Sequence, residues 1–131
     1  FITKAEHKVD INKVKAPSKE LVKIVDAMEK EKLYQQEGIT IASFAKHLAI
    51  HEYKLRHLIN GEMNYRNFND FLNHYRIKEI TEKLVEPDFI QTPVLTLALE
   101  SGFRSLSSFN KAFKTTHSIT PTEYRKTHAN E

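Results

Sequence analysis

The stretch VLTLALESGFRSLSSFNKAFKTTHSITPTEYR (94–125) has the pattern of a helix, a tight turn and a second helix. Its first apolar stripe includes Ala98, which is small enough for another helix to cross over it. Gly102 follows four residues later and can adopt the positive φ that a residue with a Cβ resists. Ser105 can cap the second helix, whose inner stripe carries Phe109. This order is typical of a helix-turn-helix unit.

An earlier stretch, IASFAKHLAIHEYKLRHLI (41–59), repeats this framework. Ala45 lies 53 positions before Ala98, and Leu55 lies 54 positions before Phe109. The difference of one residue fits a slightly longer turn in the second copy. Because two copies of one motif in a short chain are hard to obtain by chance, the sequence predicts two helix-turn-helix units.

The rest of the chain adds a linker and further helices. Residues 1–17 lack helical or strand periodicity, and we interpret them as a linker from a part of the protein that precedes this piece. An apolar stripe predicts an amphipathic helix over 18–36. The predicted domain, 18–131, then comprises a first helix-turn-helix at 40–60, a connector helix at 67–85, a second helix-turn-helix at 93–117 and a final helix at 120–127.

The composition favours an all-α protein of about seven helices. Among 131 residues, 40% are hydrophobic, and there are only three Gly and four Pro, so long helices are expected. No apolar run approaches 18 residues, so we expect no transmembrane span in this piece. The absence of Cys excludes a disulfide framework and fits a reducing cytoplasm.

The sequence shows no sign of catalysis, of a metal site or of a cofactor site. It has no nucleophile–base pair and no Gly-rich phosphate loop, so we do not expect an enzyme. His47 and His51 are four residues apart, but the predicted turn falls between them, so they need not share a face. The net charge of +3 is modest, so a nucleic-acid binder must concentrate its cations on one face.

The chain resembles the DNA-binding domain of AraC/XylS-type transcription regulators over roughly 20–127. GFRSLSSFNKAFK (102–114) and ITPTEYR (119–125) are similar to the C-terminal signature of that family. The resemblance implies seven helices, with two helix-turn-helix units joined by the connector. It also implies a bacterial-type output domain that binds double-stranded DNA in a sequence-specific way, that works with RNA polymerase, and that depends on a missing N-terminal sensor or dimerisation region.

The chain departs from the family pattern at three positions and resembles one subgroup of the family. Ala49 and Ser118 stand where Gly is usual, and His51 stands where a Ser cap is usual. YRNFNDFLNHYRI (65–77) is similar to the connector helix of a subgroup in which this domain follows a membrane-spanning half. We therefore expect a cytoplasmic domain, in a full-length protein that a preceding part could hold at a membrane.

Side chains that can contact base edges lie near the start of each second helix and face away from its apolar residues. An α-helix fits the major groove, where base edges offer distinct donor and acceptor patterns. Arg56 can bond a guanine through two parallel hydrogen bonds, His57 can donate to an acceptor, and Tyr53 can cover a thymine methyl group. The predicted base contacts are Tyr53, Arg56, His57, Ser107, Ser108 and Lys111.

A second set of residues is suited to phosphate contacts. Helix N-terminal amides near Thr40 and Thr92 can bind phosphates, and longer polar side chains flank the base-contacting sets. The predicted phosphate contacts are Thr40, Lys54, Thr92, Arg104, Asn110 and Lys114. We interpret Arg76 and Arg125 as structural residues that tie helices together.

The expected mechanism is that both recognition helices enter successive major grooves on one face of the DNA, about 34 Å apart. A monomer could then recognise an asymmetric site of roughly 20 base pairs. The alternative is a helical protein-interaction module in which the helix-turn-helix units serve only as a scaffold, and the near-neutral charge is consistent with it.

Overall fold

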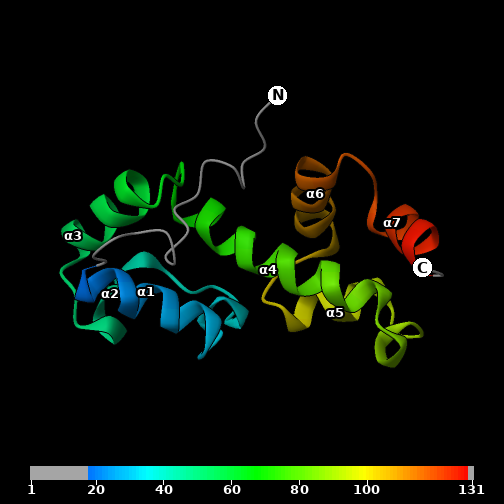
Figure 1. The fold of residues 1–131 in the computed structure, drawn as a ribbon, viewed down its shortest axis with the longest axis horizontal. Helices are drawn as coiled ribbons and strands as arrows, with labels where there is room; N and C mark the ends of the chain where they lie inside the picture. Colours follow the sequence, from blue (N-terminus) through cyan, green and yellow to red (C-terminus); the bar gives the residue numbers. More distant parts are fainter. Residues whose placement is uncertain (1–17, 130–131) are drawn as a thin grey trace. The chain divides into compact units, whose positions relative to one another are not determined.

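Residues 18–129, the part of the chain that the computed structural model describes, contain seven α-helices and no strand (Figure 1). In chain order the helices are α1 (Lys19–Glu29), α2 (Ile41–Leu48), α3 (Glu52–His57), α4 (Phe68–Val85), α5 (Val94–Glu100), α6 (Leu106–His117) and α7 (Pro121–His128). The predicted all-α class is confirmed. The predicted linker over 1–17 lies outside the described residues. None of the described helices is long and apolar enough to cross a membrane.

The chain divides into two compact units, and each unit holds one helix-turn-helix. Among the described residues, unit 1 contains 18–33 together with Ile39–Leu72, and unit 2 contains Tyr34–Gly38 and 73–129. The pair α2 and α3 lies in unit 1, and the pair α5 and α6 lies in unit 2. The prediction of two helix-turn-helix units is therefore confirmed, with α4 as the helix that runs from one unit into the other.

In unit 1, local capping sets the ends of α2. The hydroxyl of Thr40 accepts a hydrogen bond from the Ser43 N–H at 3.0 Å, and the Ser43 hydroxyl oxygen accepts one from the Thr40 backbone N–H at 3.1 Å. Ala49 ends the helix in the left-handed conformation at φ 56, although it carries a Cβ. This is the position where the resemblance leads us to expect Gly, so the turn keeps the required backbone despite the substitution.

The second helix of the first helix-turn-helix is longer than the label α3 suggests. A π-helical turn, Leu58–Glu62, follows α3 directly, so the helical segment runs from residue 52 to residue 62. Gly61 lies inside the π turn and has no positive φ, whereas Asn64, just beyond the turn, has φ 60.

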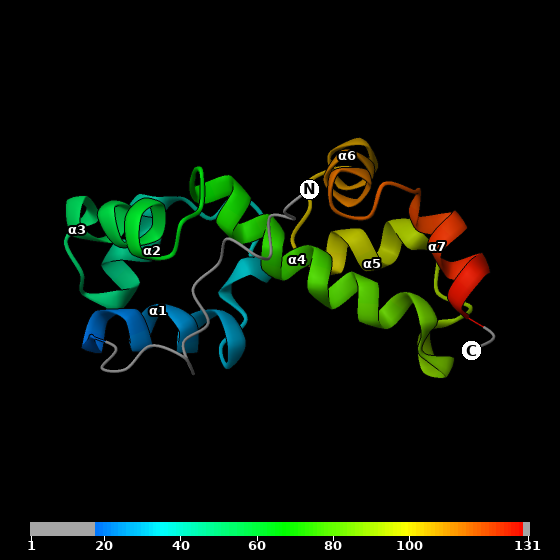
Figure 2. The same cartoon turned by 45° about the horizontal axis from the view of Figure 1, so that its top comes forward.

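In unit 2, α5 packs beside the second half of α4, as Figures 1 and 2 both show. Ile80 and Leu84 of α4 form one buried cluster with Leu97, Ala98, Phe109 and Phe113. The caps follow the sequence: Ser105 accepts from the Ser108 N–H at 3.2 Å, and Thr120 accepts from the Glu123 N–H at 3.1 Å. The turn between α5 and α6 contains Gly102 at φ 109, as predicted.

The first helix is shorter than the sequence predicted. A helix over 18–36 was expected, but α1 ends at Glu29, and Lys32 reverses the chain at φ 53. Leu33 then begins a 3-10 turn that ends at Gln35. The apolar spacing misled us because Leu33 and Tyr34 are buried, but in a separate segment and not on the stripe of α1.

Two arginines hold segments of unit 2 together, as predicted. The Nε of Arg76 donates to the Tyr34 carbonyl at 2.7 Å, and its Nη2 donates to the Gln36 carbonyl at 3.2 Å. Burial lowers the pKa of Arg76 to about 10, so the guanidinium stays charged at neutral pH. Arg125 donates to three backbone carbonyls, those of Leu84, Phe89 and Thr92, at 2.9–3.1 Å. Both side chains are therefore structural.

Candidate nucleic-acid interface

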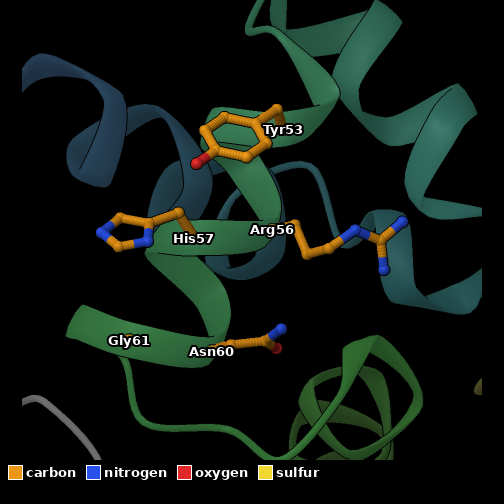
Figure 3. A pocket seen from close by; sticks show the side chains of 5 residues that line it. All are labelled: Tyr53, Arg56, His57, Asn60 and Gly61. Atoms are coloured by element: carbon orange, nitrogen blue, oxygen red, sulfur yellow. The ribbon is translucent and has the colours of Figure 1, made fainter.

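The segment that begins with α3 exposes a row of polar side chains. One shallow hollow is lined by five residues of α3 and the π turn: Tyr53, Arg56, His57, Asn60 and Gly61 (Figure 3). Tyr53 is 80% exposed and is one of the few large hydrophobic side chains that lie on the surface. The structure thus brings the three predicted base-contact residues of unit 1 onto one face of one helix.

Burial of the opposite face fixes the direction of this row. Leu55, Leu58 and Ile59 are at most 5% exposed, so the helix cannot rotate without exposing them. At about 25 cal/mol per Å² of apolar area, exposing three such side chains would cost several kcal/mol. The hollow therefore faces solvent because the apolar residues of the same helix are held in the core.

Carboxylates accompany both α3 cations of the predicted set. The Nη2 of Arg56 lies 3.6 Å from Oε2 of Glu52, four residues earlier on the helix. The Nζ of Lys54 lies 3.5 Å from Oε1 of Glu20 on α1. All four side chains are about one-third exposed or more, so these ion pairs are weak. Each cation can therefore leave its carboxylate for another partner.

In unit 2 the exposed face of α6 carries the other predicted set. Ser107, Ser108, Asn110, Lys111 and Lys114 are all exposed, whereas Phe109 and Phe113 on the inner face are completely buried. The Ser108 Oγ lies 2.9 Å from the Ser105 Oγ, so its hydroxyl takes part in the helix cap. Ser107 and the two lysines therefore offer the side chains of α6 that are most available to a ligand.

The remaining predicted phosphate contacts have partners of their own. Arg104 precedes α6, and its Nε lies 3.4 Å from Oε1 of Glu37 in the segment Tyr34–Gly38 of the same unit. The Thr40 hydroxyl is occupied by the cap of α2, so a phosphate there would be bound by backbone amides. The carbonyl of Thr92 accepts from Arg125, and α5 begins at the next residue but one, after Pro93.

Sequence reasoning missed several features of this surface. The predicted contacts do not include Asn60, yet it lines the hollow together with Arg56. The pairing of Glu52 with Arg56 could have been found, because residues four apart are neighbours on a helix. The partners of Lys54 and Arg104 are distant in sequence, and no sequence pattern indicates them.

The histidines do not assemble a metal site in the described part of the chain. The Nε2 of His47 lies 3.0 Å from Oε1 of Glu31, and His51 begins α3 without a side-chain capping bond. Within residues 18–129 no group of three or more potential metal ligands occurs.

The surface on each unit can accept an extended anionic partner with exposed hydrogen-bonding edges. Each helix presents hydrogen-bond donors and positive charge on one side, and its apolar side is held in a core. An α-helix of this kind has the width to enter the major groove of double-stranded DNA.

Comparison with known proteins agrees with this geometry. The model of a family described as a helix-turn-helix domain matches residues 44–127. A protein of unknown function from Listeria innocua is 25% identical, with 86% of this chain and 99% of that chain covered, at a TM-score of 0.69. No curated protein matches the chain.

Two other solved structures share the fold at lower identity. The C-terminal domain of AraT, a response regulator from Geobacillus stearothermophilus, is 24% identical over 84% of this chain and 88% of that chain, at a TM-score of 0.69. A transcriptional regulator from Chromobacterium violaceum, of the group with AraC-type DNA-binding domains, is 18% identical. The match covers 82% of this chain and 93% of that chain, at a TM-score of 0.69.

Proposed function

The chain belongs to the AraC-type helix-turn-helix family and is a DNA-binding output domain of a transcription regulator, and we propose that it contacts its target through α3 and α6. The observation that supports these two helices is the arrangement of their faces. In each, a buried apolar side is backed by a core, while the other side is polar, cationic and exposed. Recognition of a specific sequence requires such side chains at base edges in the major groove.

We assign the base contacts of unit 1 to Tyr53, Arg56 and His57. Arg56 can donate two parallel hydrogen bonds to the O6 and N7 of guanine. Tyr53 can cover a thymine methyl group, and His57 can donate to a base acceptor. The base contacts of unit 2 are assigned to Ser107, Ser108 and Lys111, where the short hydroxyl side chains allow a close approach of the helix.

The proposed phosphate contacts surround these residues. They position the protein without recognising sequence, because every nucleotide offers the same phosphate oxygens. Side-chain contacts are assigned to Lys54, Arg104, Asn110 and Lys114, and helix amides near Thr40 and Thr92 supply the rest. Each unit then recognises one half of an asymmetric site of roughly 20 base pairs.

The wider setting is proposed by analogy. The similar domain of AraT is the C-terminal part of a response regulator. We propose that a sensor or dimerisation region precedes this chain in the full-length protein, that the domain acts in the cytoplasm, and that it works with RNA polymerase. The likeness of 65–77 to the connector of membrane-linked regulators supports an anchor in that preceding region.

Selection of duplexes from a random pool at near-physiological salt tests the proposal. A sequence-specific binder enriches one asymmetric motif, and the enriched duplex outcompetes a scrambled duplex by at least about a thousandfold. Failure to enrich any motif, together with equal affinity for both duplexes, favours the alternative of a protein-interaction module.

A further inference from the structure

The two recognition helices differ in how their charges are compensated. On α3, Arg56 is paired with Glu52 of the same helix at 3.6 Å, and Lys54 is paired with Glu20 of α1 at 3.5 Å. The sequence of α6, LSSFNKAFKTTH, contains no acidic residue. In the described part of the chain no ion pair involves Lys111 or Lys114. Among the described residues, α3 therefore presents neutralised cations, and α6 presents uncompensated ones.

We propose that Glu52 and Glu20 screen the recognition helix of unit 1, so that unit 2 supplies most of the sequence-independent attraction to DNA and unit 1 contributes chiefly where its target base is present. This inference rests on the proposed function, because it concerns the same DNA-binding surface. It assigns a specificity-determining role to two carboxylates that contact cations of the site.

The physical argument begins with the phosphates. A cation that neutralises a phosphate releases condensed counterions, and this release makes affinity fall with salt. The pair of Arg56 and Glu52 carries no net charge, and neither does the pair of Lys54 and Glu20. Docking either pair against the sugar-phosphate backbone of DNA therefore releases few counterions. The carboxylates also approach the phosphates in such docking, and like charges repel. Unit 1 thus gains little from a random duplex.

A guanine changes this balance for Arg56. Its O6 and N7 accept two hydrogen bonds from the guanidinium, whereas Glu52 makes one contact at 3.6 Å. Both side chains are about half exposed, so the pair with Glu52 is easily exchanged. Arg56 therefore leaves Glu52 for a base with two acceptors in the correct place, and stays with Glu52 when the groove lacks such a base.

The test measures binding of the whole chain to a scrambled duplex over a range of salt concentrations. A scrambled duplex lacks the target bases, so Lys111 and Lys114 are both available to phosphates there. Lys111→Ala and Lys114→Ala should therefore each flatten the slope of log K against log[salt] by about 0.9, the value for one phosphate contact. Arg56→Ala should flatten it by less than about 0.3, because Glu52 already compensates that charge. Lys54→Ala should also flatten it by less than about 0.3, because Lys54 keeps Glu20 beside it when it contacts a phosphate. Glu52→Gln should steepen the slope by up to about 0.9, because it frees Arg56 for a phosphate.

A matched control separates this effect from a general change of charge. Glu62 is exposed at the end of the π turn, and no ion pair in the described residues involves it, so Glu62→Gln should leave the slope unchanged. The inference is overturned if Arg56→Ala flattens the slope as much as Lys111→Ala, or if Glu52→Gln and Glu62→Gln behave alike. If the unaltered chain binds neither the scrambled nor a selected duplex, the proposed function fails and the inference fails with it.

Discussion

Replacing Gly102 by Ala should disrupt the turn of the second helix-turn-helix. A Cβ at this position would overlap the Tyr34 carbonyl oxygen and would lie 2.7 Å from Nε of Arg76. The backbone there has φ 109, a conformation that L-residues with a side chain strongly disfavour. The carbonyl that would be displaced is the one that accepts the 2.7 Å hydrogen bond from Arg76.

The expected loss combines these two costs. The backbone conformation costs about 1–2 kcal/mol, and weakening a buried hydrogen bond to a charged donor costs about 1.5–3 kcal/mol, so we expect about 2.5–5 kcal/mol in total. Urea denaturation of the purified variant, followed by far-UV circular dichroism, measures the free energy of unfolding. A loss below about 1 kcal/mol would refute the packing that we describe around this glycine.

Two matched variants test the same argument, because we expect neither of them to lose stability. Ala49 holds the left-handed conformation at φ 56 with a Cβ, so Ala49→Gly should be neutral or stabilising by up to about 1 kcal/mol. A Cβ on Gly61 would meet no atom within 4 Å, and this residue has no positive φ, so Gly61→Ala should stabilise by up to about 1 kcal/mol. If all three variants lose stability to a similar extent, conformation at these positions is not the cause.

Three further predictions concern stability. Leu55→Ala and Phe109→Ala should each cost about 2–5 kcal/mol in urea denaturation because both side chains are completely buried; losses below about 0.5 kcal/mol for both would contradict the core assignment. Arg125→Lys should cost about 1–2 kcal/mol, because one ammonium group cannot reach all three carbonyls. An unchanged midpoint of urea denaturation would show that the hydrogen bonds of Arg125 do not contribute to stability. Burial, together with nearby His128, lowers the pKa of His117, so the unfolded chain binds a proton at this imidazole more readily than the folded chain. The contribution of His117 to stability should be complete above pH 6.5 and should fall as the pH drops below it. In denaturation at a series of pH values, His117→Gln should show a smaller fall.

The sequence predicted most of the local structure because local structure depends on neighbouring residues. Ser105 caps α6 as predicted, and Thr40 and Thr120 cap helices at the predicted starts, 40 and 120. Ala49 and Ser118 adopt left-handed conformations at φ 56 and 66, at positions where the family pattern has Gly. The surrounding turn imposes this backbone, so the position could be predicted although the usual residue is absent.

Features that depend on distant residues could not be predicted. The end of α1 was missed because Leu33 and Tyr34 continue its apolar spacing, whereas the hydroxyl of Tyr34 donates to Glu79 at 2.7 Å, 45 residues away. The π turn after α3 has no distinct sequence signal. The same limit applies to the candidate site: the faces of the recognition helices follow from helical periodicity, but the pairing of Lys54 with Glu20 depends on how α1 packs within unit 1.

The central claim is that each unit recognises its own half of one DNA site, and footprinting of variants on the selected duplex tests it most directly. Arg56→Ala should lose base preference at one or two positions in one half of the site, at a cost of about 1–3 kcal/mol. Joint replacement of Ser107, Ser108 and Lys111 by Ala should affect only the other half. If both variants lose protection uniformly along the duplex, the two units do not recognise DNA separately, and the account is wrong.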